Sequence, residues 1–388
     1  MRADVLRAAL FILLASRCWS KGRAASEVHA FFYLWYGTPE VDGQFRHWDH
    51  EVLPHWTEHV NKQFPQVGKR FNPSDNLLHS PFYPLAGPYS SRDTAVVRRQ
   101  IEDMARAGIS VAVLSWWGQV DKPYATDTQG VNTDSVLGEV LRIFDKTTSV
   151  KVAFHLEPYP GRSASSVRED LVYLIGKYGH HKCLYRSTAG KPLVYVYDSY
   201  HIAPAQWAQL LRDEGEQTIR GDVSADAVVL GLWLHHEHGR DIRDAGFDGF
   251  YTYFATDGFS FGSTTTNWGG MCQFAQKFNL LCNLSVGPGY NDSLIRPWND
   301  HNSRSRQGST YYNTMWTKAL KATPHYVSVT SFNEWGEGTQ IEPAVSMTAL
   351  GGRRQYLDYG DSPYLFLDVT QRWAHQLTAG REAAVRDL

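Results

Sequence analysis

Two carboxylates lie three residues apart in the segment Asn333-Glu334-Trp335-Gly336-Glu337-Gly338, which follows a β-branched run that begins at Tyr326. Glycosidic bonds are commonly cleaved by two carboxyl groups, one protonating the leaving oxygen and one acting as base or nucleophile. An indole face beside them can stack on a sugar ring. The alternative is a polar turn whose Trp335 covers the core, although a surface turn gains nothing from a tryptophan flanked by acids. The segment therefore predicts a sugar-cleaving site in which Glu334 and Glu337 are the working pair.

Two further carboxylates follow apolar runs elsewhere in the chain. Glu157 precedes Pro158, which ends its run, and it is a third candidate for the site. A salt bridge to a neighbouring arginine is the alternative for Glu157. Asp198 is either a site carboxylate or the cap of the next helix, since Asp is a favoured cap residue. The spacing of Glu334 and Glu337 on a loop does not fix their separation, so it predicts neither retention nor inversion.

The consecutive residues His235, His236, Glu237 and His238 suggest a metal site. They lack the HExxH spacing that places two histidines on one helical face. Neighbouring residues of a strand point to opposite faces, so these four cannot all reach one ion there. A structural or catalytic metal needs three or four converging ligands. We therefore predict no metal and no cofactor, and a metal hydrolase stays the least favoured alternative.

Eight short apolar runs must position these residues, at 28–33, 109–115, 150–156, 192–197, 227–233, 249–253, 280–286 and 326–332. Continuous apolar runs are typical of strands buried on both faces, as in a parallel sheet. Helical patterns lie between them, at 95–107, 135–146, 167–178, 204–214, 268–278 and 311–322. This alternation predicts an α/β fold with a single (β/α)8 TIM barrel over residues 28–388. The long stretches 37–91 and 291–309 are too aromatic for disorder and predict functional loops.

Polar and aromatic residues follow nearly every one of the eight runs. They are Tyr36, Trp117, Glu157, Asp198, His235, Tyr253, Tyr290 and Glu334, in chain order. In a barrel of this kind the active site lies at the C-terminal rim of the strands. We therefore expect these side chains to gather around one site.

Composition and charge narrow the choice of partners. The formal net charge is -2 and the pI about 6.8, which gives no electrostatic reason to bind nucleic acid or an anionic membrane. Aromatic residues make up 13% of the chain, which suits an oligosaccharide partner and a large aromatic core equally. No CxxC motif occurs. A bridge between Cys272 and Cys282 is one option, but the pairing of Cys183, Cys272 and Cys282 is left open.

The N-terminal residues 1–27 predict a signal peptide or a short signal anchor. Arg2 and Arg7 precede an apolar run from Ala8 to Ala15, which is shorter than the ~20 apolar residues of a spanning helix. Either form directs the chain to the secretory pathway. Contact with a membrane is expected only if this segment is an anchor.

Nine segments of the chain resemble glycoside hydrolase family 99, the endo-α-1,2-mannosidases. They are FYLWYG, FYPLAGPYSSRD, LSWW, FHLEPY, YVYDSY, GFDGFYTYFAT, SVGPGY, IRPWN and SFNEWGEGTQIE. The resemblance extends from about residue 28 to the end of the chain. It implies a (β/α)8 enzyme that cuts internal α-1,2-mannosidic bonds with retention and without a metal.

The resemblance also implies roles for individual residues. Glu334 acts as a base on the mannose 2-hydroxyl, which attacks its own anomeric carbon and gives a 1,2-anhydro sugar. Glu337 protonates the leaving oxygen and later activates the water that opens this intermediate. These roles require that the surroundings of Glu334 and Glu337 give the two carboxyl groups different pKa values. Tyr36, Glu157 and Tyr253 match positions that hold the sugar.

Trp117 departs from the animal pattern, which resembles SWYPP where this chain has SWWG. Trp117 resembles the residue that bacterial members that cut mannans have at this position. In the family, the residue at this position contacts the sugar before the cleaved bond. The expected substrate is a glucosylated high-mannose N-glycan in the Golgi. An endo-α-1,2-mannanase acting on mannan is the first alternative, and a carbohydrate-binding barrel without catalysis is the second. Vertebrate members carry an anchor and a stem, so retention in the Golgi lumen or membrane is one expectation and secretion after cleavage of residues 1–27 the other.

Overall fold

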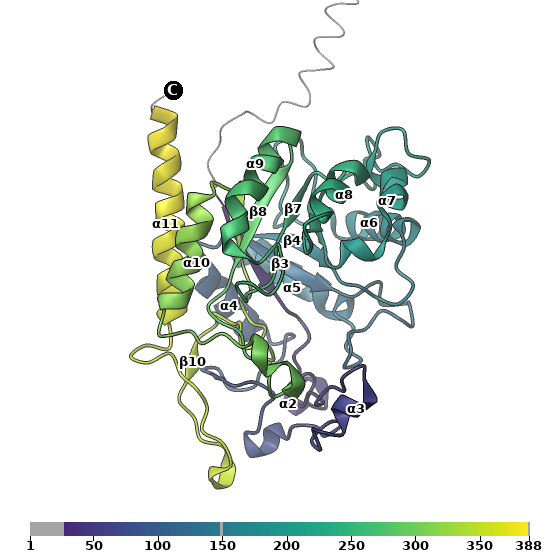
Figure 1. The fold of residues 1–388 in the computed structure, drawn as a ribbon. Helices are drawn as coiled ribbons and strands as arrows, with labels where there is room; N and C mark the ends of the chain where they lie inside the picture. The colour runs from purple at the N-terminus through teal and green to yellow at the C-terminus, as the bar shows by residue number, and fades with distance from the viewer. Residues whose placement is uncertain (1–26, 148–149, 387–388) are drawn as a thin grey trace, which may run out of the picture.

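Eight parallel strands close into a barrel in the computed structural model, which describes residues 27–147 and 150–386 (Figure 1). They are β1 (Glu27–Phe32), β3 (Val111–Trp116), β4 (Lys151–Leu156), β5 (Leu193–Val196), β6 (Val228–Leu232), β7 (Gly249–Tyr251), β8 (Leu281–Val286) and β9 (Tyr326–Val329). Each strand pairs with the next in chain order, and β1 closes the barrel on β9 with Glu27 opposite Tyr326. The predicted (β/α)8 barrel is confirmed, and each of the eight apolar runs overlaps a strand.

Eight longer helices surround the barrel (Figure 1). They are α4 (Thr94–Arg106), α5 (Asp134–Thr147), α6 (Ala164–Tyr178), α7 (Pro204–Leu211), α8 (His238–Ala245), α9 (Trp268–Phe278), α10 (Thr310–Lys321) and α11 (Leu365–Arg386). Six of them coincide with the predicted helices to within a few residues, but α8 and α11 were not predicted. In α4 the Asp93 side chain accepts a hydrogen bond from the Ala95 backbone, and Val97, Ile101 and Met104 form the buried face. This is the amphipathic pattern that packs a helix onto a sheet.

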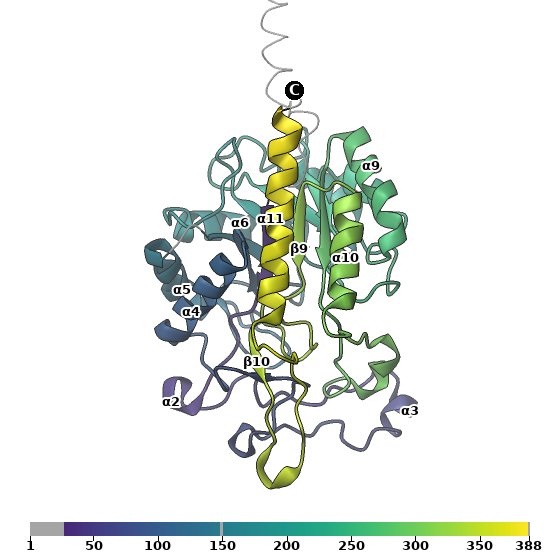
Figure 2. The ribbon, with the colours of Figure 1, turned by 90° about the vertical axis from the view of Figure 1, so that its left-hand side faces the viewer.

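Long loops gather at one end of the barrel, beyond the C-terminal ends of β1, β8 and β9. They hold the short helices α2 (Pro39–Asp42) and α3 (Glu58–Asn61) and the strands β2 (Tyr83–Pro84) and β10 (Ala344–Val345), which pair antiparallel. In Figures 1 and 2 these elements lie at the lower end of the molecule, opposite the C-terminal end of α11. Both stretches predicted as functional loops therefore lie at the rim where barrel enzymes place their active sites.

The barrel interior beneath this rim is filled by aromatic and polar side chains. The ring of Phe31 lies 5.0 Å from that of Tyr253, and the Nε2 atom of His155 lies 2.8 Å from the Tyr251 hydroxyl. All four side chains are buried. The interior is therefore a packed floor for the site rather than a channel.

A disulfide links Cys272 of α9 to Cys282 of β8, with the two Cα atoms 5.4 Å apart, and Cys183 is free and buried. The predicted signal segment, residues 1–27, lies outside the described residues except for Glu27, which begins β1. None of the helices in the described part of the chain has the length and apolar character needed to cross a membrane.

Candidate active site

The two predicted carboxylates lie on one loop between β9 and β10, residues 330–342, which we call the carboxylate loop. The Ser331 hydroxyl accepts a hydrogen bond of 2.7 Å from the Glu334 backbone N–H. The Glu334 Oε1 atom in turn accepts one of 3.2 Å from the Glu337 backbone N–H. Gly336 makes this turn possible, because a Cβ atom there would lie 2.8 Å from His79 Cδ2 and 3.1 Å from Glu334 Oε1. The loop geometry therefore directs both carboxylates toward the same site.

Burial sets the electrostatics of this pair. The Glu334 side chain is 5% exposed, and burial raises the pKa of its carboxyl well above the ordinary value, with a further contribution from the Glu337 charge. Burial also raises the pKa of Glu337, but the Arg296 charge opposes this rise. Two carboxyls in such a site titrate as a pair, and a single shared proton is the expected state at intermediate pH.

Arg296 is a site residue that the sequence analysis did not assign. Its Nη1 atom lies 3.2 Å from Glu337 Oε1 and 3.1 Å from Asp292 Oδ2. Asn299 also donates to Asp292, over 3.0 Å. Asp292 thus orients the guanidinium, and the guanidinium stabilises the ionised form of Glu337. The four-residue spacing between Asp292 and Arg296, which lies in the IRPWN segment, was the available signal.

Three tyrosines line the site beside the carboxylates. The Tyr36 hydroxyl donates to the Asn333 carbonyl over 2.8 Å, and the hydroxyls of Tyr33 and Tyr253 are hydrogen bonded to each other. Burial raises the pKa of all three phenols well above the ordinary value, so they remain protonated hydrogen-bond donors. Tyr253 has φ of 56°, a backbone conformation that is uncommon for non-glycine residues and concentrates at functional sites. Tyr36 and Tyr253 were predicted, whereas Tyr33 was not.

Glu157 lies in the same site at the end of β4. It is 5% exposed, and its Oε1 atom accepts from the Ser115 hydroxyl over 2.8 Å and lies 3.1 Å from His155 Nδ1. His155 therefore takes the place of the arginine considered from the sequence. The Glu157 charge contributes to raising the pKa of both Glu337 and Asp198, which indicates that it lies near both.

Asp198 precedes the short 3-10 helix Ser199–His201 but does not cap it, since its side chain accepts no hydrogen bond from that helix's backbone. Its Oδ2 atom lies 3.6 Å from His201 Nε2. Burial raises the pKa of Asp198, while Tyr200 and His201 oppose that rise. The site interpretation of Asp198 therefore agrees better with its geometry than the capping interpretation.

The two predicted tryptophans differ in position. Trp117 is partly exposed after β3, and its backbone N–H donates to Thr133 Oγ1 over 3.3 Å. Its indole nitrogen has no hydrogen-bond partner among the described residues. Trp335 has no exposed surface. Its indole N–H donates to Glu342 over 2.9 Å and lies 3.2 Å from the Tyr89 hydroxyl. The expectation that Trp335 stacks on a sugar is wrong for this structure, because the Glu342 carboxylate holds the indole inside the core.

Glu342 is itself a buried anchor for the carboxylate loop. Besides Trp335, the Gln100 amide and the Tyr89 hydroxyl each donate to its carboxylate over 2.7 Å. Burial raises the pKa of Glu342 to about 7, and these three donors oppose the rise. The loop is therefore fixed to α4 and to the long loop after β1.

Arg306 supports the carboxylate loop from behind. Its Nη2 atom donates to the Gly338 and Gln340 carbonyls over 2.9 Å and 2.7 Å. The guanidinium also lies over the rings of Phe82 and Phe366, at 4.3 Å and 4.5 Å. It is 8% exposed and has no carboxylate partner among the described residues. Arg306 therefore positions the loop without touching either carboxylate.

The histidine-rich segment after β6 does not converge. His238 begins α8 and is buried, and its Nδ1 atom accepts from the Leu234 and His235 backbone, each over 3.3 Å. His235, His236 and Glu237 are exposed, and the His236 ring packs against Phe261. Within residues 27–147 and 150–386 these four side chains do not form a metal-binding group.

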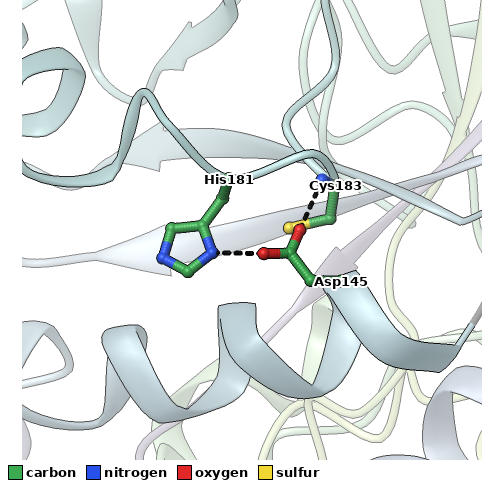
Figure 3. A group of neighbouring side chains, drawn as sticks. All are labelled: Asp145, His181 and Cys183. Carbon is green, nitrogen blue, oxygen red and sulfur yellow. Dashed lines mark hydrogen bonds and ion pairs between the residues drawn. The ribbon is translucent and has the colours of Figure 1, made fainter.

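Asp145, His181 and Cys183 form a separate cluster (Figure 3). It lies near the N-terminal end of β4, where the Val152 backbone N–H donates to the Cys183 carbonyl over 2.8 Å. Asp145 Oδ2 lies 2.6 Å from His181 Nδ1, and its Oδ1 accepts from the Cys183 backbone over 2.8 Å. The thiol lies 3.5 Å from the Leu141 carbonyl, and burial raises its pKa, which disfavours a thiolate ligand. The polar groups of this cluster are thus partnered, and it joins the end of α5 to the segment before β5.

Comparisons with known proteins show the family of this chain. The family model described as Glycosyl hydrolase family 99 matches residues 24–379. The mouse glycoprotein endo-alpha-1,2-mannosidase-like protein is 44% identical over 93% of this chain and 78% of its own length. The rat glycoprotein endo-alpha-1,2-mannosidase is 42% identical over 91% of this chain and 75% of its own length. At these sequence identities, the two relatives and this chain belong to one family.

A solved structure agrees in fold as well as in sequence. The family 99 endo-alpha-mannosidase of Bacteroides thetaiotaomicron superposes with a TM-score of 0.81 at 38% identity, over 92% of this chain and 99% of that one. The family match, the relatives and the barrel with its paired carboxylates point to the same class of enzyme. This chain is an endo-α-1,2-mannosidase-like glycoside hydrolase and belongs to glycosyl hydrolase family 99.

Proposed function

We propose that this enzyme is a retaining endo-α-1,2-mannosidase that cleaves internal α-1,2-mannosidic bonds through a 1,2-anhydro sugar. The observation that carries the proposal is the pairing of two carboxyls on one loop, the buried Glu334 held by a main-chain N–H group and the partly buried Glu337 held by Arg296. Glu334 takes the proton of the mannose 2-hydroxyl as that oxygen attacks the anomeric carbon. Glu337 gives its proton to the leaving oxygen and later takes one from the attacking water.

The proton must move between the carboxyls when substrate binds. In the free enzyme the Arg296 ion pair favours ionised Glu337, whereas the proposed acid must be protonated. A bound sugar supplies a hydroxyl donor to Glu334, which stabilises its carboxylate and leaves the shared proton on Glu337. Tyr36, Glu157, Asp198 and Tyr253 hold the sugar ring in this proposal, and no metal or cofactor takes part.

The proposed substrate is a glucosylated high-mannose N-glycan of the secretory pathway, from which a glucose-mannose fragment is released. Processing in the Golgi is the proposed setting. Both mammalian relatives are named for glycoprotein substrates, which supports this choice. An endo-α-1,2-mannanase is the second candidate, because the partly exposed Trp117 resembles the bacterial members that cut mannans.

The test compares two α-1,2-linked substrates, one capped by glucose and one by mannose, and identifies the products by mass. Cleavage of the glucose-capped substrate alone supports N-glycan processing. Preference for the mannose-capped substrate moves the enzyme to the mannanase function. Proton NMR of the first product gives the anomeric configuration, and a β product at early times would refute the retaining mechanism. Absence of cleavage with retained binding would favour a carbohydrate-binding barrel.

A further inference from the structure

Two asparagines of this chain lie in the acceptor motif for N-linked glycosylation, which is Asn-X-Ser or Asn-X-Thr with X other than proline. The motifs are Asn283-Leu284-Ser285 and Asn291-Asp292-Ser293. The proposed secretory location would expose both motifs to the transferase that recognises them. A glycan is bulky and hydrophilic, so a folded protein carries one only where the asparagine amide nitrogen reaches solvent. The structure therefore separates two motifs that the sequence leaves equal.

Asn283 cannot carry a glycan in the folded barrel. It lies in β8, has no exposed surface, and pairs with Tyr326 of β9. Its Nδ2 atom, the atom that would bear the sugar, donates to the Tyr195 hydroxyl over 2.8 Å. A sugar on this nitrogen would have to occupy space that the barrel interior already fills. Asn283 is therefore unmodified in every molecule whose barrel has closed.

Asn291 meets the requirement that Asn283 fails. It follows β8 in a loop and is partly exposed. Its Oδ1 atom accepts hydrogen bonds from the Ser293 hydroxyl over 2.7 Å and from the Ser293 backbone N–H over 3.1 Å. Its Nδ2 atom has no hydrogen-bond partner among the described residues and keeps contact with solvent. The oxygen of the amide is thus held by Ser293, while the nitrogen is free to bear a substituent.

The contacts around Asn291 would survive the addition of a glycan. The Asn291 backbone N–H donates to the Glu337 carbonyl over 2.8 Å. The next residue, Asp292, is buried and lies 3.1 Å from Arg296 Nη1. These contacts use the main chain of Asn291 and the side chain of Asp292, and Nδ2 of Asn291 takes part in neither. The glycan would therefore begin beside the active site without displacing the groups that hold Arg296 and the carboxylate loop.

We propose that Asn291 carries an N-linked glycan at the edge of the active site and that Asn283 carries none. The inference rests on the secretory location in the proposed function. The donor is an oligosaccharide joined to a lipid through a diphosphate. A bond forms between Nδ2 and the anomeric carbon of the first sugar, and the bond from that carbon to a diphosphate oxygen breaks. The diphosphate leaves with the electron pair, and the amide nitrogen loses one proton to a base of the transferase.

The test translates the full chain, residues 1–388, in the presence of microsomal membranes and then treats the product with peptide N-glycosidase in water enriched in oxygen-18. This enzyme converts a glycan-bearing asparagine into an aspartate that holds one heavy oxygen. Mass spectrometry with peptide fragmentation locates the label. We expect a labelled aspartate at position 291 and an unlabelled asparagine at position 283.

Three variants separate the motif from the fold. Ser293→Ala and Asn291→Gln each destroy the motif, so both should lose the label and one step in gel mobility. Ser293→Thr is the matched control, because it keeps a hydroxyl at the third position and should retain both. A mobility step that persists in Ser293→Ala and Asn291→Gln would assign the glycan to another residue and overturn the proposal.

A protease added outside the sealed membranes measures entry of the chain independently of glycosylation. A protected chain without a label at position 291 overturns the glycan proposal and leaves the proposed enzymatic function intact. A label at position 283 in protein whose Cys272–Cys282 bridge has formed also overturns it, because that residue is buried beside the bridge. A chain that stays open to the protease refutes the secretory location, and the glycan proposal fails with it. Cleavage of an α-1,2-mannoside by the purified enzyme tests the chemistry separately.

Discussion

The Glu337 backbone nitrogen lies 3.2 Å from the Oε1 atom of Glu334, so the main chain of one proposed catalytic residue holds the side chain of the other. Because the backbone N–H is kept in every substitution at position 337 except proline, the Glu337 side chain can be replaced without removing this hydrogen bond to Glu334. The acid and base functions of the pair can therefore be tested separately.

Replacement of Glu337 by Gln should lower turnover of an α-1,2-linked mannoside more than about 100-fold, because an amide cannot supply the proton that the leaving oxygen needs. Steady-state kcat on a natural oligosaccharide checks this. A substrate with an acidic aryl leaving group needs little protonation, so the substitution should reduce turnover of that substrate less. Glu40→Gln, at an exposed position on α2, is the control. Wild-type turnover in Glu337→Gln would exclude Glu337 as the acid.

Replacement of Arg296 by Gln should move the alkaline limb of the kcat/KM profile to higher pH. The Arg296 charge lowers the pKa of Glu337, so its removal raises that pKa. The proposed acid then stays protonated at pH values where the wild-type acid has lost its proton. Arg296→Lys keeps the charge and should shift the limb less. A limb that moves to lower pH in Arg296→Gln would contradict the assigned ion pair.

Replacement of Arg306 by Met should lower both stability and kcat while changing KM less. The substitution removes two charge-assisted hydrogen bonds to the carbonyls of Gly338 and Gln340, which costs about 2–4 kcal/mol of unfolding free energy. Chemical denaturation and steady-state kinetics at low temperature measure the two effects. Arg304→Met is the control, since Arg304 donates to the Ser303 and Asp257 carbonyls and not to the carboxylate loop. An unchanged kcat in folded Arg306→Met would reduce Arg306 to a stability role.

Replacement of both Cys272 and Cys282 by Ala should lower the free energy of unfolding by about 2–3 kcal/mol, the expected value for a short closed loop. The bridge joins α9 to β8 away from the rim, so activity at low temperature should persist. Dithiothreitol should reduce wild-type stability to that of the variant and leave the variant unchanged. A reductant effect on the variant would point to Cys183 instead.

Incubation with EDTA should leave activity unchanged, as should the double substitution His235→Ala and His236→Ala. The side chains of this segment point apart, and the His238 Nδ1 atom already accepts hydrogen bonds from the Leu234 and His235 backbone. Activity assays before and after chelation, with Zn²⁺ or Mn²⁺ added back, check this. Loss on chelation that the added metal restores would revive the metal-hydrolase alternative.

The barrel strands were predictable from the sequence because strands buried on both faces appear as continuous apolar runs. Helix α8 was missed because it has only eight residues and is mostly polar, although its buried residues Gly239, Ile242 and Ala245 lie on one face. Helix α11 does contain an apolar face, with Phe366, Leu367 and Val369 buried. The sequence therefore held the pattern needed to predict this helix. Continuous apolar runs are thus easier to recognise than short amphipathic helices.

The candidate site was predictable only where chemistry and motif coincide, as at Glu334 and Glu337. Arg296 and Arg306 were not predicted because the sequence does not distinguish a site arginine from a surface arginine until its distant partner is known. Trp335 was misassigned because adjacency to two acids does not determine the direction of the indole. Glu342, seven residues later, determines it by accepting the indole N–H.

Closure of the barrel between β1 and β9 has a consequence for synthesis of the chain. β1 begins at Glu27 and pairs with a strand that begins only at Tyr326, and α11 then packs on β1 and α4. Until β9 has left the ribosome, β1 and β8 present unpaired edges that invite aggregation or chaperone binding. The carboxylate loop follows β9, so a nascent chain has no catalytic site. Enzymatic competence therefore requires that synthesis has passed the carboxylate loop, residues 330–342.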